Sequence, residues 1–270
     1  MLLDGAALPG LGVTLLAVAL AIGRSQGNSR LVAGATAFLQ MTCFTILSVA
    51  LSYLLAARAG HLWDAELALA DARLGLLWPA IFDAADRVPV VLLALSGMAY
   101  HSLVLQMVLC IVVLAATRRL ERLRASIAAA VLSGVVTVLI SGIMPALGNM
   151  FDPSHFNRLW PSVAWLDRDL VLALRDGSLR QVDLSHLTGI VSFPSYHSTL
   201  PVILVWALHP IAALRIPAAI WAALTIAATP LFGGHYAVDV LAGLLLAVVA
   251  ITVTRRLTSE KPSYGRNAPA

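Results

Sequence analysis

Long apolar stretches recur along this chain, and they restrict its fold more than any other feature. A helix needs about 20 apolar residues to cross the hydrocarbon core of a bilayer. None of the stretches alternates apolar and polar residues as a membrane β-barrel strand does, so the sequence predicts an all-α, polytopic membrane helix bundle. Seven stretches are candidate spans, the first of them short: Leu8–Gly23, Leu31–Ala57, Val88–Thr117, Ala125–Leu147, His197–Leu214, Ile216–Phe232 and Tyr236–Thr254.

The composition supports a membrane protein. Of the 270 residues, 60% are hydrophobic and only 12% are charged, whereas a soluble domain has about 25% charged residues. The mean hydropathy is +0.87. These values exclude a disordered chain, a nucleic-acid-binding arm and an ordinary cytosolic globule.

The basic residues predict which connections face the cytoplasm. Four connections hold 11 of the 18 Lys and Arg residues but only two of the 14 acids. Because short cytoplasmic loops are enriched in Lys and Arg, we expect the N-terminus outside and the C-terminus inside. The net charge of +4 follows from this topology, so no nucleic-acid partner is expected. The Ala- and Leu-rich composition favours the plasma (inner) membrane of a bacterium. The four connections are those with Arg24 and Arg30, with Arg118–Arg124, with Arg215 and with Arg255–Arg266.

One carboxylate, Asp239, lies at the start of the last span, and an ionisable group there is costly unless it is functional or paired. His235 precedes it by four residues, so both side chains share one face of a helix. A carboxylate in this position can hold an imidazole in one tautomer and stabilise its cation. The alternative is a hydrogen bond at the helix start without chemistry.

A second helix start is expected at the same membrane face. Ser195 is a predicted N-cap, and the N–H groups that follow it attract anions. The Gly233–Gly234 pair precedes His235 and lets the backbone approach a ligand closely. His197 and His235 are 38 residues apart, the length of one helical hairpin, so we expect them to converge. Two helix starts, two imidazoles and one carboxylate predict a site that handles phosphate.

These residues resemble a known family. Pro194-Ser195-Tyr196-His197, followed by Gly234-His235-Tyr236-Ala237-Val238-Asp239, is similar to the second and third signatures of the type 2 phosphatidic acid phosphatase superfamily. The form is closest to its inositol-phosphotransferase-like branch. The resemblance covers about 125–254, and it implies a six-helix phosphatase core with an extra N-terminal helix.

The resemblance implies phosphoryl transfer without a metal or another cofactor. His235 would attack phosphorus and become a phosphohistidine, and Asp239 would orient it. His197 would protonate the leaving group and then activate water, while Ser195 would donate to a phosphate oxygen. The expected activity is hydrolysis of a lipid phosphate monoester or pyrophosphate at the outer membrane face, with membrane lipids as the surrounding partners.

The sequence departs from the family pattern at its cations. The Lys and Arg-Pro of the first signature are not legible, and Ala228-Thr229-Pro230 stands where the third signature has Ser-Arg. We expect Arg175 to substitute as a phosphate ligand, followed by Arg158, because a guanidinium suits phosphate. A solvated loop charge is the alternative for each. Arg168 and Arg180 complete the set of available substitutes in this loop.

The expected organisation has three parts. Residues 1–124 form N-terminal membrane helices with an outer amphipathic helix near 61–87, which is either a lid or a plain anchor. Residues 125–258 form the catalytic membrane core with an outer loop at 148–193. Residues 259–270 form a flexible cytoplasmic tail.

Two other functions stay open at this stage. A lipid phosphotransferase of the inositol phosphorylceramide synthase type would use the same histidines with an alcohol as acceptor. A metal-binding transporter would use His197, His235 and Asp239 as two-His-one-carboxylate ligands, although we expect no metal. His101 is expected to be a core residue without a functional role.

Overall fold

The computed structural model describes residues 2–4, 7–58, 60–179, 181–183 and 188–259. It confirms the all-α membrane bundle: these residues form eleven α-helices, two short helices of other types and two three-residue strands. The strands β1 (Leu2–Asp4) and β2 (Gln181–Asp183) pair in parallel. The predicted tail lies outside the described residues except for Ser259, the last residue of α11.

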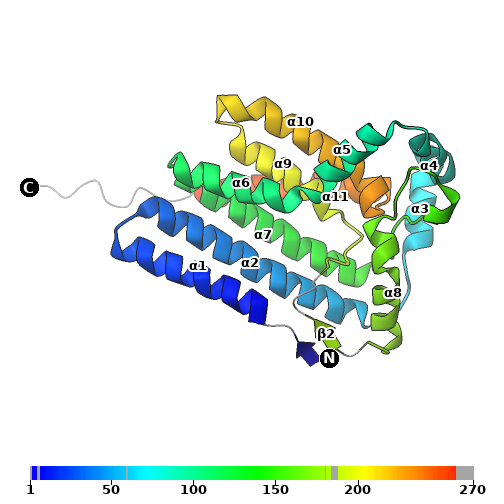
Figure 1. The fold of residues 1–270 in the computed structure, drawn as a ribbon, viewed down its shortest axis with the longest axis horizontal. Helices are drawn as coiled ribbons and strands as arrows, with labels where there is room; N and C mark the ends of the chain where they lie inside the picture. Colours follow the sequence, from blue (N-terminus) through cyan, green and yellow to red (C-terminus); the bar gives the residue numbers. More distant parts are fainter. Residues whose placement is uncertain (1, 5–6, 59, 180, 184–187, 260–270) are drawn as a thin grey trace, which may run out of the picture.

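The long helices run side by side along one direction (Figure 1). The central helix is α9 (Tyr196–Leu208), which packs against α6, α7, α10 and α11. The surrounding helices are α1 (Ala7–Ser25), α2 (Ser29–Ala56), α5 (Val90–His101), α6 (Leu103–Ala116), α7 (Leu120–Ile143), α10 (Ala212–Ala228) and α11 (Ala237–Ser259).

Four described helices are long and apolar enough to cross a membrane: Ser29–Ala56, Leu120–Ile143, Ala212–Gly233 and Ala237–Thr258. The helices α5 and α6 make a fifth span if the bent pair counts as one. Two shorter apolar helices, α1 and α9, complete the seven predicted stretches. The helix α1 is the extra N-terminal helix, and it packs against α2.

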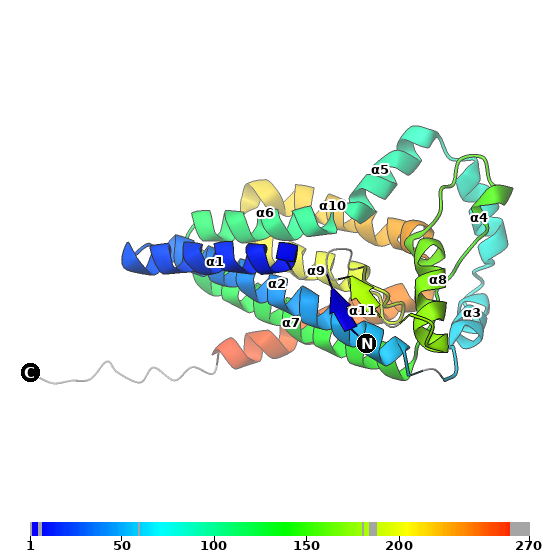
Figure 2. The ribbon, with the colours of Figure 1, turned by 60° about the horizontal axis from the view of Figure 1, so that its bottom comes forward.

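The predicted span 88–117 is broken at Ser102, where α5 and α6 meet at an angle of 56°. Figure 2 shows α5 diverging from the line of α6. The cause is the carbonyl of Ala99, which accepts hydrogen bonds from the side chains of Ser102 (2.8 Å), Thr225 (3.0 Å) and Gln106 (3.4 Å). Side chains that enter the backbone ladder in this way kink a helix.

The turn between α9 and α10 lies earlier than the predicted boundary at Arg215. The helix α9 ends at Leu208, and α10 begins at Ala212. Pro210 lies between them and lacks the N–H that a continuing helix would need. Arg215 is therefore in the first turn of α10, where it donates to the carbonyl of His209.

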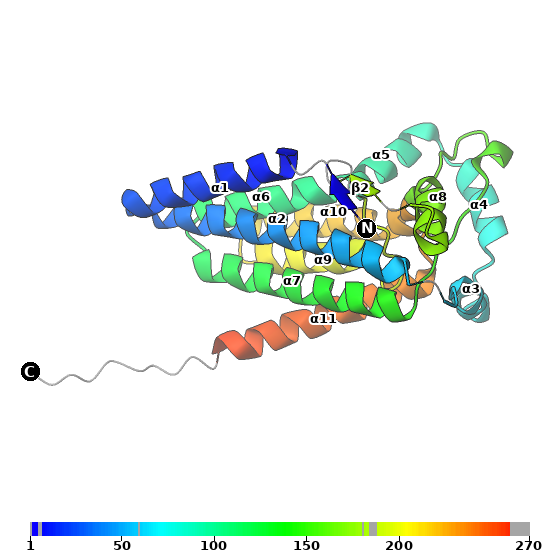
Figure 3. The ribbon, with the colours of Figure 1, turned by 90° about the horizontal axis from the view of Figure 1, so that it is seen from below.

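Three short helices cover one end of the bundle (Figures 1 and 3). The single amphipathic helix expected near 61–87 is two helices, α3 (Asp64–Arg73) and α4 (Trp78–Asp86). Gly75 separates them with a φ of +83°, a left-handed conformation that glycine adopts without strain. The 148–193 loop contains the 3-10 helix η1 (Pro153–His155) and α8 (Val163–Asp176).

The connections rich in Arg lie at the other end of the bundle. The α1–α2, α6–α7 and α9–α10 turns and the end of α11 gather there, away from α3, α4 and α8 (Figure 1). The fold therefore groups the basic connections as the sequence predicted. The membrane side that each end faces stays a prediction.

Candidate functional site

The pair His235 and Asp239 lies where α11 begins. His235 stands just before α11 and Asp239 is in its first turn. Nδ1 of His235 is 3.3 Å from Oδ2 of Asp239, with both side chains buried. His235 therefore lies outside the helix, and the Asp239 side chain in the first turn of α11 lies against it. The carboxylate therefore faces Nδ1 and leaves Nε2 for other partners.

Asp239 also holds the neighbouring backbone. Its Oδ2 accepts from the N–H of Tyr236 at 3.0 Å and from the hydroxyl of Ser192 at 3.3 Å. Its backbone carbonyl accepts from the N–H of Ser195 at 3.0 Å. The start of α9 is thus attached to the first turn of α11, which fixes the two predicted helix starts relative to each other.

His197 lies in the first turn of α9 and faces the same region. Its imidazole stacks on the phenol ring of Tyr100, with centroids 4.3 Å apart and an interplanar angle of 17°. The centroids of the His197 and His235 rings are 6.4 Å apart. The structure therefore brings together the three residues that the sequence predicted as catalytic.

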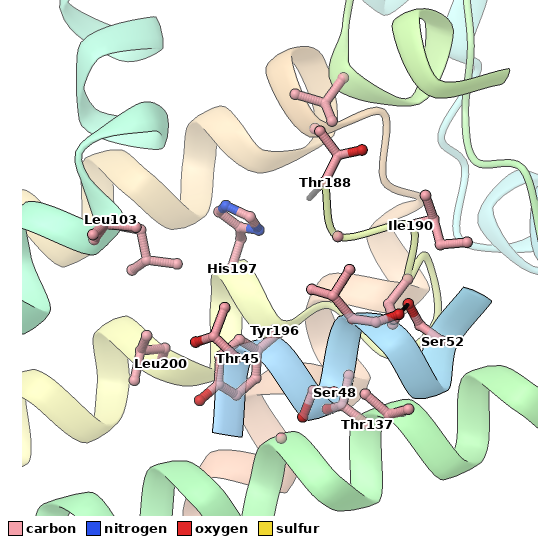
Figure 4. Close-up of a pocket in the computed structure, with 18 of the residues that line it drawn as sticks. Thr45, Ser48, Ser52, Leu103, Thr137, Thr188, Ile190, Tyr196, His197 and Leu200 are labelled. Atoms are coloured by element: carbon pink, nitrogen blue, oxygen red, sulfur yellow. Dashed lines mark hydrogen bonds between the residues drawn. The ribbon is translucent and has the colours of Figure 1, made fainter. Parts of the chain in front are cut away.

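The two imidazoles line a cavity of about 680 Å³, a size typical of sites for small ligands. Its walls come from α2, α5, α6, α7, α8, α9 and the segments 188–192 and 233–235. Figure 4 shows the His197 ring projecting into this space, with Leu103 on one side and Thr188 and Ile190 on the other. Many of the other side chains that line the cavity are apolar, including those of Phe38, Met41, Phe44, Val104, Met107 and Ile111.

Among the described residues that line the cavity there is no Lys or Arg. The side chain of Arg175 donates to the carbonyl of Gly60. The side chain of Arg158 donates to the carbonyls of Arg87 and Val88, both at 3.2 Å. The structure does not bring these two arginines to the histidines, and their phosphate-binding role stays a prediction. Arg180 lies outside the described residues.

Ser195 is the N-cap residue of α9, as predicted, but its hydroxyl makes no capping hydrogen bond. The side chain is completely buried, and its Oγ has no partner among the described residues. Ser195 itself does not line the cavity. The hydroxyl that is predicted to donate to phosphate therefore has no partner among the described residues, but it is not part of the cavity lining.

Two glycines allow the backbone to approach the site closely. Gly148 has a φ of +108° and Gly234 a φ of +71°. A Cβ on Gly148 would lie 2.5 Å from the carbonyl oxygen of Gly234, which also accepts from the N–H of Asn149 at 2.6 Å. The loop after α7 is therefore pressed against the segment that carries His235.

The family of the chain follows from a match that covers most of its length. The family model of the PAP2 superfamily matches residues 65–253. The chain belongs to the PAP2 superfamily. The match covers α3 except Asp64, both helix starts and the three converging residues, and it supports a phosphatase-type function on lipid phosphates. It supports the PAP2 superfamily but not the inositol-phosphotransferase-like branch. No curated protein and no solved structure matched the chain.

Sequence reasoning missed several residues of the site in this PAP2 superfamily member. His101, expected in the core, is exposed and lines the cavity, with its ring edge-on to Tyr100 at 5.0 Å. Tyr100 and Ser192 contact the catalytic candidates from elements that the motifs do not include. Only the position of Ser192 directly before the Phe193-Pro194-Ser195 motif gave a signal.

The described residues contain no group of three His, Cys, Asp or Glu side chains that could hold a metal ion. His197, His235 and Asp239 are close together, but the carboxylate faces Nδ1 of one imidazole and the other ring stacks on a phenol. This arrangement does not fit the ligand set of the metal-binding transporter.

Among the described residues that line the cavity, one carboxylate is present, that of Asp167 in α8. Burial raises the pKa of Asp167, and a hydrogen bond with the side chain of Thr188 partly opposes this shift. Its Oδ2 is buried without a partner among the described residues. One oxygen of the Asp167 carboxyl is therefore left without a hydrogen bond from the described residues.

Proposed function

We propose that this protein is a membrane phosphatase that hydrolyses a lipid phosphate monoester or pyrophosphate through a phosphohistidine at His235. The observation that carries the proposal is the pairing of His235 with Asp239 at 3.3 Å, beside His197 and at the wall of a largely apolar cavity. The apolar part suits lipid chains, and the imidazoles suit the phosphate.

In the first step Nε2 of His235 attacks phosphorus, and the bond from phosphorus to the lipid oxygen breaks. Asp239 accepts the hydrogen bond of the Nδ1 proton and stabilises the cation that forms. His197 gives its proton to the leaving oxygen, so the lipid leaves as an alcohol, or as the monophosphate from a pyrophosphate.

In the second step a water molecule gives a proton to His197 while its oxygen attacks phosphorus. The bond between phosphorus and Nε2 breaks, and inorganic phosphate leaves. The centroid separation of 6.4 Å between the two rings is compatible with a phosphoryl group between an attacking atom and a leaving atom. Each histidine ends the cycle in its starting state.

The phosphate charge needs donors, because the described cavity lining has no Lys or Arg. The first turn of α9 is the available helix N-terminus at the site, and helix N-termini bind anions through their N–H groups. Together with the His197 and His101 side chains, this helix start would hold the phosphate oxygens.

Phosphate release from a panel of lipid phosphates tests the proposal. The purified wild type and the His235→Ala variant are compared in detergent with EDTA. We expect release by the wild type that EDTA does not reduce and that the variant lacks. Release that EDTA abolishes would contradict the mechanism.

Two further outcomes would change the assignment. A wild type that releases no phosphate from any lipid, but transfers it to added inositol or another alcohol, would favour the lipid phosphotransferase of the inositol phosphorylceramide synthase type. An unchanged rate in the His235→Ala variant would show that the nucleophile is another group.

The proposed location is the outer face of a plasma membrane, with the site at the end opposite the basic connections.

A further inference from the structure

Asp71 lies on the interfacial helix α3, outside both sequence motifs, and its side chain is completely buried. Its Oδ2 accepts from the N–H of Ala237 at 2.7 Å, and its Oδ1 accepts from the N–H of Val238 at 2.9 Å. Oδ2 also accepts from the indole N–H of Trp78 at 2.7 Å. Both oxygens of this carboxylate are thus hydrogen-bonded, two of the three donors being the first residues of α11.

The first N–H groups of a helix have no acceptor within the helix, and a Ser, Thr, Asp or Asn just before it usually supplies one. Here His235 and Tyr236 occupy the positions before α11. The Tyr236 N–H donates to Asp239, and the next two N–H groups donate to Asp71, which is 166 residues away from Ala237. A helix outside the motifs therefore caps the helix that carries the catalytic pair.

A second carboxylate of α3 holds the same region. Asp64 accepts from the N–H groups of Leu147 at 3.0 Å and Gly148 at 2.9 Å. The hydroxyl of Tyr236 donates to Asp64 at 3.3 Å. The helix α3 thus binds both the loop after α7 and the residues next to His235.

On these contacts we propose that Asp71 is a positioning residue for the reaction: by capping α11 it fixes the His235–Asp239 pair. The inference rests on the proposed function. It also gives the two helix starts different roles, because a carboxylate already occupies the N-terminus of α11. An incoming phosphate therefore binds at the start of α9 and not at both helix starts.

The Asp71→Asn variant tests this role, because the amide nitrogen cannot accept and one N–H of α11 loses its acceptor. We expect kcat per folded protein to fall about tenfold or more, since small misplacements of a reacting group are costly. KM should stay within about twofold, because the cavity lining is unchanged. The matched control is Trp78→Phe, which removes the third hydrogen bond of Asp71 but leaves both bonds to α11.

Amide hydrogen exchange of a peptide covering 233–240 gives a readout that does not need activity. We expect faster exchange in Asp71→Asn than in Trp78→Phe. A wild type that releases no phosphate would overturn the proposed function, while the exchange would still test the cap. If Asp71→Asn has the same kcat as wild type, and its Tm is lowered only as much as that of Trp78→Phe, then Asp71 has only a structural role.

An independent observation concerns the cavity wall. Thr137 on α7 is 2% exposed and lines the cavity, and its Oγ1 has no hydrogen-bond partner among the described residues. Hydroxyls in helices commonly bond the carbonyl of a preceding residue, as Ser52 does with Val49. A buried hydroxyl without any partner is unusual and requires an explanation.

Thr137 is not the only hydroxyl at this wall. Thr42, Thr45 and Ser48 on α2 line the same cavity, and within the described part of the chain their side chains make no hydrogen bond. Figure 4 shows Thr45, Ser48 and Thr137 below His197. The same cavity is also lined by many apolar side chains, but a wall that carries these hydroxyls differs from a channel for pure hydrocarbon.

The geometry points to a substrate that carries carbonyl oxygens close to its phosphate, which these hydroxyls bind as donors. This inference also rests on the proposed function. Ester carbonyls of a diacylglycerol phosphate and the amide carbonyl of a ceramide phosphate share this chemistry, whereas a polyprenyl phosphate has only hydrocarbon beyond its phosphate. A buried hydroxyl without a hydrogen-bond partner is costly. Such a site therefore discriminates against a lipid that has no hydrogen-bond acceptor beyond its phosphate.

Binding to the His235→Ala variant tests the subsite without turnover. The Tm of this variant is measured with dioleoyl phosphatidic acid, a ceramide phosphate or undecaprenyl phosphate, since a ligand that binds only the native state raises Tm. We expect tighter binding of the first two, and a loss of about tenfold in their affinity when Thr45→Val and Thr137→Val are added. The matched control is Thr36→Val on α2, which does not line the cavity.

The two carbonyl-bearing lipids distinguish an ester site from an amide site. Two results would overturn the proposed subsite. One is that undecaprenyl phosphate binds as tightly as dioleoyl phosphatidic acid and the ceramide phosphate. The other is that the two Val substitutions leave the affinities for these lipids unchanged. Failure of the proposed function would be recognised separately, as wild-type protein that binds these lipids but releases no phosphate from them.

Discussion

The imidazole of His197 stacks on the ring of Tyr100, with centroids 4.3 Å apart. Tyr100 is 3% exposed and lies at the end of α5, just before the break at Ser102. The bend between α5 and α6 therefore places the ring that supports the predicted proton donor. No motif includes this contact.

Replacement of Tyr100 tests the stacking. We expect Tyr100→Leu to slow both phosphoenzyme formation and its hydrolysis about tenfold, because His197 loses the surface that orients it. Tyr100→Phe keeps the ring and should stay close to wild type. Rapid quench with a radiolabelled lipid phosphate measures both steps. Equal rates in the Leu and Phe variants would contradict a role for the ring.

Removal of the Asp239 charge should affect turnover far more than folding. In Asp239→Asn the amide oxygen in the place of Oδ2 can still accept from Tyr236 and from Nδ1 of His235, but it has no charge to stabilise the His235 cation. By analogy with other His-orienting carboxylates we expect turnover to fall about 10⁴-fold. Phosphate release and Tm are measured with Asp169→Asn, an exposed substitution on α8, as the control. Activity above a tenth of wild type would be inconsistent with this role.

The contact between α9 and α11 requires glycine at position 243. A Cβ on Gly243 would collide with the hydroxyl of Ser198 and the carbonyl oxygen of Ser195. We expect Gly243→Ala to lower the free energy of unfolding by about 1–3 kcal/mol, as overpacking does, and to lower activity by separating the helices that carry His197 and Asp239. Gly12→Ala on α1 is the control, because a Cβ there meets nothing within 4 Å. Thermal unfolding in detergent compares them.

Asp167 should make the protein less stable at neutral pH than at acidic pH. Burial raises its pKa in the folded state, so its contribution to stability is present below its unfolded value of about 3.9 and is lost as the pH rises. We expect Asp167→Asn to have a higher Tm than wild type at pH 7 and the same Tm near pH 4. A Tm gain that does not vary with pH would contradict this.

We expect Asp86 on α4 to change stability with pH in the direction opposite to that of Asp167. Hydrogen bonds from the backbone N–H groups of Arg158, Asn157 and Leu159 lower the pKa of Asp86 against a weaker opposing effect of burial. Its stabilisation is present above the unfolded pKa and is lost as the pH falls through the folded pKa. Asp86→Asn should therefore have a lower Tm than wild type at pH 7, and the two should converge in acid.

Sequence patterns predicted the features that depend on local spacing. The four-residue separation of His235 and Asp239, and one hairpin length between His197 and His235, were enough to predict their convergence. The expected shared helix face was wrong in detail, because His235 lies just before α11 and not on it. Apolar stretches also predicted the membrane bundle. The turn near Arg215 was misplaced by only a few residues, because Pro210 ends α9 earlier.

Contacts between distant residues could not be predicted in this way. The break at Ser102 depends on Thr225, and the cap of α11 depends on Asp71; both partners are more than 100 residues away. The expected phosphate ligands Arg158 and Arg175 bind backbone carbonyls elsewhere, and loop composition gives no information on where a long side chain ends.

The most direct test of the mechanism is the covalent intermediate. Wild type, His197→Ala and His235→Ala are mixed with a lipid labelled with radioactive phosphorus in the phosphate, and the protein-bound label is measured after a rapid quench. We expect a short-lived label on the wild type, a slowly formed and persistent label on His197→Ala, and none on His235→Ala. The label should be stable in base and labile in acid, as a phosphoramidate is. A protein-bound label on His235→Ala would contradict the assignment of His235 as the nucleophile.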